Sequence, residues 1–173
     1  MKIVVVNGAP ESGKTTFENL CNYLIEANPH KYGINTCFVF STINFVKEVA
    51  KFCGWNGEKT SENRRFLSDL KDLLTEWGDV PIRKIEEGIR NFNINLYSDS
   101  TLIFIDSREP KEIKRLQNEW GATSILVRRP NHQILASNHA DAEVENYKYD
   151  YIIENDGSLE DLTGKANDFL EWI

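Results

Sequence analysis

The sequence predicts an α/β fold in which a parallel β-sheet is covered by helices on both faces. Short apolar, strand-like runs alternate along the chain with segments whose apolar residues recur at helical spacing, a pattern typical of βαβ units. The run from Gly8 to Thr15, Gly-Ala-Pro-Glu-Ser-Gly-Lys-Thr, matches G-x-x-x-x-G-K-[ST] between the first strand-like run and the first helical segment. Ligands of such folds bind at the carboxyl ends of the strands, where we expect the functional residues.

Five short apolar runs are expected to form the strands. The first contains Ile3-Val4-Val5-Val6, and β-branched residues of this kind favour strands. The five predicted strands are residues 2–6, 37–41, 101–106, 123–128 and 150–153.

Helical periodicity fills the segments between these strands. The first helix stops at Asn28-Pro29, Pro81 and Pro110 occupy favoured first helical positions, and Ser158 with Asp161 resembles a capping box. The predicted helices are 14–27, 43–53, 62–77, 81–96, 110–120 and a last one after Ser158. Helix 62–77 places six large apolar residues on one face: Phe66, Leu67, Leu70, Leu73, Leu74 and Trp77.

The composition indicates one domain over residues 1–173, and it excludes several classes of protein. The net charge of −7 lacks the basic footprint of a general nucleic-acid binder, so a nucleic-acid partner is disfavoured. No apolar run has the length of a membrane span, and no signal peptide is recognisable, so we expect a cytoplasmic protein without a membrane partner. A homodimer is compatible with this sequence. Cys21 and Cys53 fall at apolar helical positions and are interpreted as small core residues of a reducing cytosol.

The G-x-x-x-x-G-K-[ST] run predicts a nucleoside triphosphate site, with ATP and Mg²⁺ as the ligands. Its glycines let the backbone curl around phosphates, and the loop N–H groups and the helix N-terminus supply partial positive charge. Lys14 adds a full charge near the β- and γ-phosphates, and the Thr15 hydroxyl can ligate Mg²⁺. The predicted nucleotide-binding residues of this loop are Gly8, Ala9, Glu11, Ser12, Gly13, Lys14, Thr15 and Thr16.

Two further candidates follow the third predicted strand. Asp106 ends an apolar run, as expected for an aspartate that organises Mg²⁺, although capping of the helix at Pro110 by Asp106 or Ser107 is the alternative. Arg108 could clamp a substrate phosphate, and the alternative is a surface salt bridge to Glu112.

Arg128 and Arg129 end the fourth predicted strand and are candidates for stabilising the transferred phosphoryl group. They begin a lid-like segment over about 128–147. One functional arginine beside one solvated neighbour is as good an interpretation as a working pair. His139 and Glu143 have the spacing of a metal pair, but no third ligand is visible, so a metal site there is disfavoured.

The consecutive helices between the second and third strands interrupt the alternation, and an insertion of about 43–98 is a natural acceptor-binding region of a phosphotransferase. Within it, Arg64 lies nearer the apolar face, whereas Arg65 can pair with Asp69. Trp55 lies in a Gly-flanked turn beside basic residues and could stack on a base. By composition alone, Lys47 is a solvated lysine.

Several segments, taken together, resemble the bacteriophage-type deoxynucleoside monophosphate kinases. In order and spacing they span nearly the whole chain: Phe45 to Val49, Gly54 to Thr60, Arg64 to Leu67, Ile105 to Glu112, Val127 to Pro130, Asn138 to Glu143 and Tyr151 to Leu159. Animal-type phosphomevalonate kinases are similar at Trp77-Gly78, at Ile85 to Ile89 and in the Asp-x-Arg segment.

This resemblance implies a three-layer α/β/α P-loop NTPase fold of nucleoside-monophosphate-kinase type, with a five-stranded parallel sheet of order 2-3-1-4-5. It implies ATP–Mg²⁺ in the loop, adenine near Asn155 to Gly157, and a lid that contributes Arg128 or Arg129. The expected acceptor-binding residues are Ser41, Lys47, Trp55, Lys59, Arg64, Arg65, Arg108 and Glu143. Two departures from the family pattern are Ala9-Pro10-Glu11, where many relatives have a more basic loop, and Ser107, where the nucleotide kinases usually carry an aliphatic residue.

The favoured hypothesis is therefore phosphoryl transfer from ATP to a small-molecule nucleotide substrate, a (deoxy)nucleoside monophosphate. A second hypothesis keeps the reaction but changes the acceptor to phosphomevalonate or to a modified nucleotide in DNA. A third is a nucleotide-binding switch without transferase activity. Several arginines placed after strands argue against a switch, which needs no second phosphate pocket.

Overall fold

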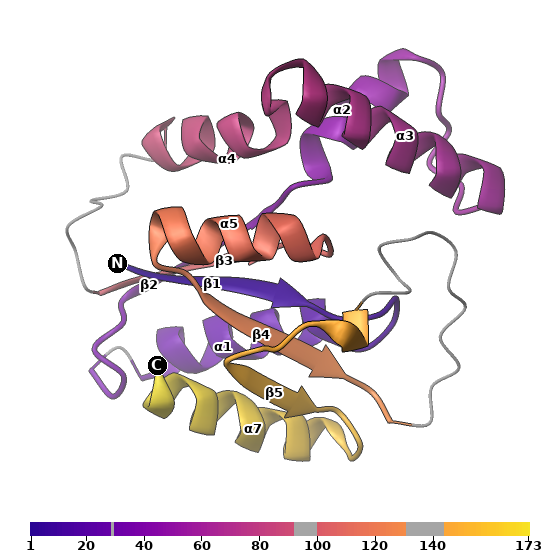
Figure 1. The fold of residues 1–173 in the computed structure, drawn as a ribbon. Helices are drawn as coiled ribbons and strands as arrows, with labels where there is room; N and C mark the ends of the chain where they lie inside the picture. Colours follow the sequence, from indigo (N-terminus) through magenta and orange to yellow (C-terminus); the bar gives the residue numbers. More distant parts are fainter. Residues whose placement is uncertain (29, 92–99, 131–143) are drawn as a thin grey trace.

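A five-stranded parallel sheet forms the centre of the molecule (Figure 1). The computed structural model describes residues 1–28, 30–91, 100–130 and 144–173. The strands are β1 (Lys2–Asn7), β2 (Thr36–Ser41), β3 (Thr101–Asp106), β4 (Thr123–Arg128) and β5 (Tyr151–Glu154). Their spatial order is β2-β3-β1-β4-β5 and every neighbouring pair is parallel, which confirms the predicted fold class and strand order.

Helices cover both faces of this sheet, so the molecule has three layers (Figure 1). On one face α1 (Lys14–Ala27) and α7 (Leu159–Trp172) enclose a core in which the rings of Phe17, Phe104 and Phe169 contact one another. On the other face a second core contains isoleucines of α4 (Val80–Asn91) and α5 (Pro110–Trp120). The alternating strand residues Val4 and Val5 belong to opposite cores, as the period of two in a strand requires.

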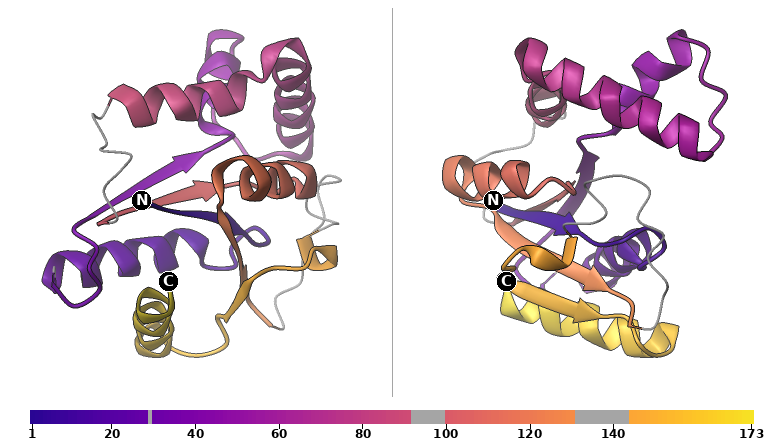
Figure 2. Two further views of the ribbon diagram at one scale, coloured as in Figure 1. Left: turned by 60° about the vertical axis from the view of Figure 1, so that its left-hand side comes forward. Right: turned by 45° about the vertical axis from the view of Figure 1, so that its right-hand side comes forward.

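The described residues contain two further helices and one 3-10 turn. They are α2 (Asn44–Phe52), α3 (Ser61–Gly78) and η1 (Val144–Asn146). The helices α2, α3 and α4 lie between β2 and β3 in the chain and contact one another (Figure 2). No helix among the described residues combines the length and the apolar character needed to cross a membrane.

The apolar face of α3 is only partly buried. Lys71 is the one residue of α3 that is buried. Leu73 is 61% exposed and Trp77 is 83% exposed. The surface by which α3 contacts its neighbours is offset from the centre of this apolar face. Leu67, Leu70 and Leu74 are half-buried, whereas Leu73 and Trp77 face outward.

The structure contradicts one of the two core assignments made for cysteine. Cys21 is fully buried in the core between α1 and the sheet, as expected. Cys53 is exposed, because α2 ends at Phe52 and Cys53 follows as its C-terminal cap. Helical spacing was a poor guide at this helix end, where Phe52 is itself 94% exposed.

Candidate active site

The loop between β1 and α1 has a backbone that only glycine suits at two positions. Gly8 has φ of 153°, and a Cβ there would lie 2.3 Å from the carbonyl oxygen of Val127. Gly13 has φ of 101°, and a Cβ there would lie 2.4 Å from Nδ2 of Asn155. Glu11 also adopts a left-handed conformation, with φ of 61°. The loop is therefore a tightly curled backbone held close to β4 and to the segment after β5.

The N-terminus of α1 is left open for an anion. Gly13 caps this 14-residue helix without a side-chain hydrogen bond, and the first turn has no acidic residue. The N–H groups of the first helical turn have no partner within the helix, and the helix dipole favours negative charge there. Thr15 and Thr16 are exposed at this end.

Lys14 lies folded over the loop that it follows. Its Nζ donates to the carbonyl oxygens of Gly8, at 2.6 Å, and of Ala9, at 3.0 Å. The hydroxyl of Ser12 is buried in the same loop and has no hydrogen-bond partner. A phosphate group in the loop would accept hydrogen bonds from this hydroxyl and from the positively charged Lys14 ammonium.

Two asparagines brace the loop at its two ends. Asn7 is fully buried; its Oδ1 accepts from the Gly8 N–H at 2.7 Å, and its Nδ2 donates to the hydroxyl of Tyr149 at 2.7 Å. Asn155 donates through Nδ2 to the carbonyl oxygen of Ser12 at 2.9 Å. Asn155 was predicted near the adenine, and the structure places its side chain against the phosphate loop. The exposed Gly157 follows it, ahead of the Ser158 cap of α7.

Asp106 lies at the carboxyl end of β3, between the ends of two other strands. Its register partners are Val6 of β1 and Ser41 of β2, so the predicted residues Ser41 and Asp106 are neighbours. The alternative of a helix cap is not observed, because Glu109 is the N-cap residue of α5 and makes no side-chain capping bond. One carboxylate oxygen of Asp106 is buried without a hydrogen-bond partner.

Glu18 is a site residue that the sequence reasoning missed. It is 2% exposed on α1, one turn after Lys14, and its Oε1 is buried without any protein donor. Burial, followed by the negative charge of Asp106, raises the pKa of Glu18 to about 8. Burial likewise raises the pKa of Asp106, against the opposing charges of Lys14 and Arg108. The available signal was a glutamate on the same helical face as Phe17 and Cys21, which were expected in the core.

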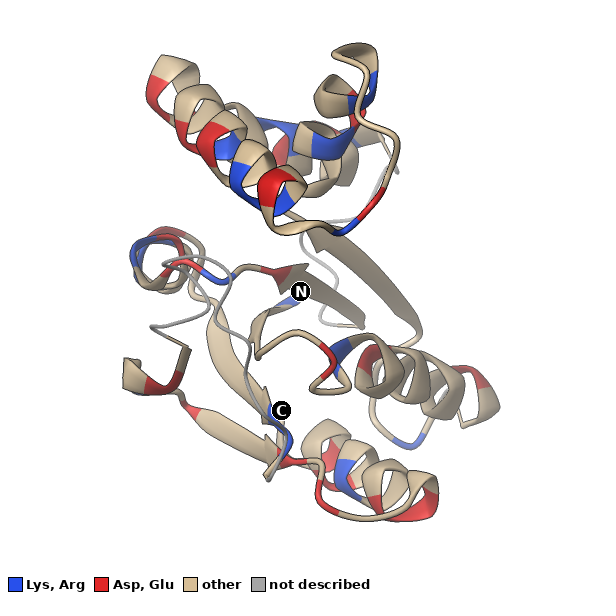
Figure 3. Cartoon of the chain, turned by 90° about the vertical axis from the view of Figure 1, so that its right-hand side faces the viewer, with Lys and Arg blue, Asp and Glu red and all other residues tan. Residues whose placement is uncertain are grey.

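A group of cations faces this carboxylate pair from the insertion and from the end of β3. Lys47 of α2 is half-buried, and its pKa is lowered first by burial and then by the charges of Arg108 and Lys59. Asp106 acts on Lys47 in the opposite direction. By composition alone Lys47 is a solvated lysine, whereas the fold brings it close enough to Arg108 for the two positive charges to interact. Lys and Arg of the insertion are seen above the carboxyl ends of the strands in Figure 3.

The other candidates of the insertion are engaged locally. Arg65 is exposed and forms an ion pair with Asp69 at 3.7 Å, as the i,i+4 spacing predicted. Arg64 is half-buried and its Nε donates to the carbonyl oxygen of Lys59 at 3.2 Å. Trp55 is half-buried, and its Nε1 donates to the carbonyl oxygen of Glu58 at 3.2 Å.

The two arginines at the end of β4 differ in their surroundings. Arg128 donates through Nε to both carboxylate oxygens of Glu154, at 3.0 and 3.1 Å, and it pairs with Glu145 at 3.1 Å. These hydrogen bonds raise the pKa of the Arg128 guanidinium above its already high value. Arg129 is exposed. Of the proposed lid, residues 131–143 lie outside the described part of the chain, and the predictions for His139 and Glu143 fall there.

The site suits a metal that arrives with a nucleotide. Within residues 1–28, 30–91, 100–130 and 144–173, no group of three or more His, Cys, Asp or Glu side chains is arranged to hold a metal. Thr15 and the unpartnered Asp106 oxygen supply only part of an oxygen set, and Mg²⁺ commonly completes such a set with waters and phosphate oxygens. The residues present therefore fit Mg²⁺ bound to a polyphosphate.

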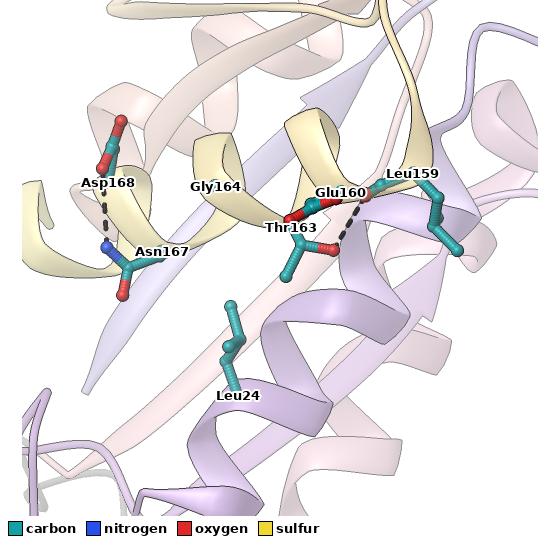
Figure 4. Close-up of a pocket in the computed structure, with 7 residues that line it drawn as sticks. All are labelled: Leu24, Leu159, Glu160, Thr163, Gly164, Asn167 and Asp168. Atoms are coloured by element: carbon teal, nitrogen blue, oxygen red, sulfur yellow. Dashed lines mark hydrogen bonds between the residues drawn. The ribbon is translucent and has the colours of Figure 1, made fainter.

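A groove of about 700 Å³ lies elsewhere, between α1 and α7 (Figure 4). Leu24 and Leu159 contribute apolar surface, and the remaining lining comes from α7, including Glu160, Thr163 and Asp168. It contains none of the candidate residues and has no cationic lining, so it is unsuited to a phosphate.

Several solved structures have some similarity to this chain. No protein-family model matches the chain, and no curated protein sequence matches it. Shikimate kinase from Bacteroides thetaiotaomicron is 14% identical with a TM-score of 0.48, over 98% of both chains. APS kinase from Mycobacterium tuberculosis, in complex with AMPPNP and APS, is 15% identical with a TM-score of 0.48, over 98% of this chain and 97% of that one. Shikimate kinase from Aquifex aeolicus is 12% identical with a TM-score of 0.45, over 98% and 96%.

Proposed function

We propose that this protein transfers the γ-phosphoryl group of ATP to a small phosphorylated acceptor, and that the acceptor is a nucleoside monophosphate, with deoxynucleotides the first to test. The observation that carries this proposal is the pairing of two anion sites around Asp106. On one side lies the open N-terminus of α1 with Lys14. On the other side lie Lys47 and Arg108, close enough for each charge to act on the other.

The phosphate loop is proposed to hold the donor. Its backbone N–H groups and the α1 terminus bind the β-phosphate, and Lys14 exchanges its two carbonyl acceptors for phosphate oxygens. Thr15 and Asp106 would hold Mg²⁺, directly and through water, and the ion would supply positive charge that offsets the negative charge of the phosphates.

The cationic group is proposed to hold the acceptor phosphate. Lys47, Lys59 and Arg108 would position one acceptor oxygen in line with the γ-phosphorus. That oxygen forms the new bond to phosphorus while the bond to the bridging oxygen breaks, and ADP leaves with the electron pair. A phosphate acceptor is already anionic, so no general base is required. Trp55, in the loop between Lys47 and Lys59, favours a base over an isoprenoid chain.

Arg129 is proposed as the arginine that reaches the transferred phosphoryl group. Arg128 is bound by Glu154 and Glu145, and releasing it would leave those two carboxylates without their common partner. Arg129, its exposed neighbour, has no such constraint among the described ion pairs. This proposal adopts the interpretation in which only one of the two arginines is functional.

The proposal is tested by a coupled ADP-release assay with ATP and Mg²⁺ against the common nucleoside and deoxynucleoside monophosphates, with phosphomevalonate as a further acceptor. We expect acceptor-dependent turnover with one or a few nucleotides. Turnover with phosphomevalonate alone would reassign the acceptor. ATP binding without turnover on any acceptor would contradict the kinase proposal and favour a switch.

The control variant for this assay is Lys14→Ala. We expect turnover to fall by about 10²-fold or more, because the variant loses a charge used in the transition state. Circular dichroism should show an intact fold, since the hydrogen bonds from Lys14 to Gly8 and Ala9 lie within the loop and Lys14 belongs to neither apolar core. Near-normal turnover in this variant would rule out the proposed site.

A further inference from the structure

A buried ion pair joins the insertion to the segment that carries Asp106 and Arg108. Nζ of Lys71 on α3 lies 2.9 Å from Oε2 of Glu112 on α5. Their side chains are only 10% and 12% exposed. The same carboxylate oxygen accepts a hydrogen bond from the Ser107 hydroxyl at 2.6 Å, and Ser107 is 2% exposed. We call Lys71, Glu112 and Ser107 the buried network.

The backbone of the 106–108 segment is already fixed toward the sheet. The Ser107 N–H donates to the carbonyl oxygen of Val6 at 3.1 Å, and the Thr42 N–H donates to that of Asp106 at 3.2 Å. These bonds hold the segment against β1 and β2. The side chain of Ser107 joins the segment to α3 by way of Glu112.

The acceptor-binding residues proposed above come from two parts of the fold, the insertion and the sheet. Lys47 and Lys59 belong to the insertion, whereas Arg108 follows a strand of the sheet. Their mutual distance therefore depends on how the insertion sits on the sheet. To bind one phosphate together, the lysines of the insertion and Arg108 must keep their separation constant to within about 1 Å.

We propose that the buried network is a positioning device for the acceptor site, in which Lys71 and Glu112 act through Ser107 to keep Arg108 in register with the cations of the insertion. The effect of the network on catalysis rests on the proposed function. The network explains why α3 buries a lysine while Leu73 and Trp77 remain outside. A buried pair of charges has a narrower geometry than an apolar contact, so it specifies one docking arrangement.

A second ion pair between the same helix regions provides a matched control. Arg115 of α5 lies 2.7 Å from Asp79, the C-terminal cap residue of α3. Neither residue contacts Ser107 in the described bonds, and the Arg115 side chain is 40% exposed. Arg115→Met therefore removes a charge and a contact between α3 and α5 without touching the 106–108 segment.

The experiment compares Lys71→Met, Ser107→Ala and Arg115→Met with the wild-type chain. The first measurement is steady-state kinetics with the best acceptor of the monophosphate panel. We expect KM for the acceptor to rise about tenfold in Lys71→Met and severalfold in Ser107→Ala, with KM for ATP within twofold. Arg115→Met should leave both values within twofold. Equal effects of Lys71→Met and Arg115→Met would overturn the proposal, since general docking of α3 would then explain them.

The second measurement needs no acceptor. Hydrogen exchange of a peptide covering residues 106–109 should be severalfold faster in Lys71→Met and Ser107→Ala than in wild type or Arg115→Met. Unchanged exchange overturns the proposal whether or not the protein is a kinase. Faster exchange with an unchanged acceptor KM also overturns it, because the network is then only structural. If wild type turns over no acceptor, the proposed function fails and exchange alone decides whether the network holds the segment. Ser107→Ala, a small change, keeps the test valid if Lys71→Met fails to fold.

Discussion

At the residue scale, the site is defined by side chains whose partners lie far away in the sequence. Glu18 faces Asp106 and Lys14, and the two carboxyl groups are close enough for a protonated Glu18 to donate a hydrogen bond to Asp106. Two buried carboxyl groups in proximity retain a proton more readily than either would alone. Glu18 therefore makes the free protein sensitive to pH.

We predict that Glu18→Gln flattens the pH dependence of stability. The pKa of Glu18 is about 8 in the folded protein and close to 4.5 when unfolded, so the folded chain binds the proton more tightly. The free energy of unfolding should then fall as pH rises from about 4.5 to about 8. The variant has no charge to bury and should be more stable than wild type at pH 8.5 by about 2 kcal/mol. Urea unfolding of both proteins between pH 5 and 8.5 measures this difference.

The control is Glu26→Gln, which changes an exposed glutamate of the same helix. It should follow the wild-type pH profile within about 0.5 kcal/mol. A Glu18→Gln profile parallel to wild type would show that this carboxyl group is ionised in the folded protein throughout the range.

At the element scale, helix α3 shows that a periodic pattern predicts a helix without predicting which part of its apolar face is buried. Its N-terminus has the capping bond expected of Thr60, whose hydroxyl accepts from the Asn63 N–H at 3.2 Å. Its apolar residues, however, exceed what α2 and α4 cover. Such a helix is held by one half-buried stripe and by the buried Lys71–Glu112 pair.

We predict that the outward stripe of α3 contributes little to stability. Trp77→Gln should change the free energy of unfolding by less than about 0.5 kcal/mol, because the indole is 83% exposed. Ile113→Ala on α5 should cost about 2 to 5 kcal/mol, because Ile113 is fully buried between α5 and the sheet. Urea unfolding of the two variants makes the comparison. A loss above 2 kcal/mol for Trp77→Gln would mean that this face is covered in solution.

At the scale of the whole molecule, the two regions that we propose bind phosphates come from separate parts of the architecture. The loop after β1 lies at the centre of the sheet, and the neighbouring strand β3 ends at Asp106, two residues before Arg108. The insertion brings Lys47 to the same edge. Parallel strands align their carboxyl ends, so residues 6, 41 and 106 become neighbours despite their separation in the chain.

We predict that ADP with Mg²⁺ stabilises the whole fold and that removal of the metal weakens this effect. At about 100 times Kd, a ligand of the native state adds about 2.7 kcal/mol, which corresponds to a rise of about 5 to 10 °C in Tm for a chain of this size. Excess EDTA should reduce the shift, and Lys14→Ala should largely abolish it. Thermal unfolding by circular dichroism provides the measurement. A shift in Lys14→Ala equal to that of wild type would place the nucleotide elsewhere.

The sequence alone determined the strands, their parallel arrangement and the phosphate loop. These features depend on local rules: period-two and period-3.6 patterns, turn-forming residues, and a motif whose parts lie within eight consecutive residues. The motif has its glycines at positions 8 and 13, and at both positions the structure shows a close approach that a Cβ would block. The family resemblance supplied the strand order, which the structure confirms.

Only the tertiary structure decided which charges meet. Arg128 and Arg129 are equivalent in sequence, and pairing of β4 with β5 sets Arg128 against Glu154, 26 residues away. Glu112, which the sequence offered as the alternative partner of Arg108, accepts hydrogen bonds from Lys71 and Ser107. Coulombic contacts depend on distance in space, which the packing of layers sets, whereas sequence spacing governs neighbours only within one helix or strand.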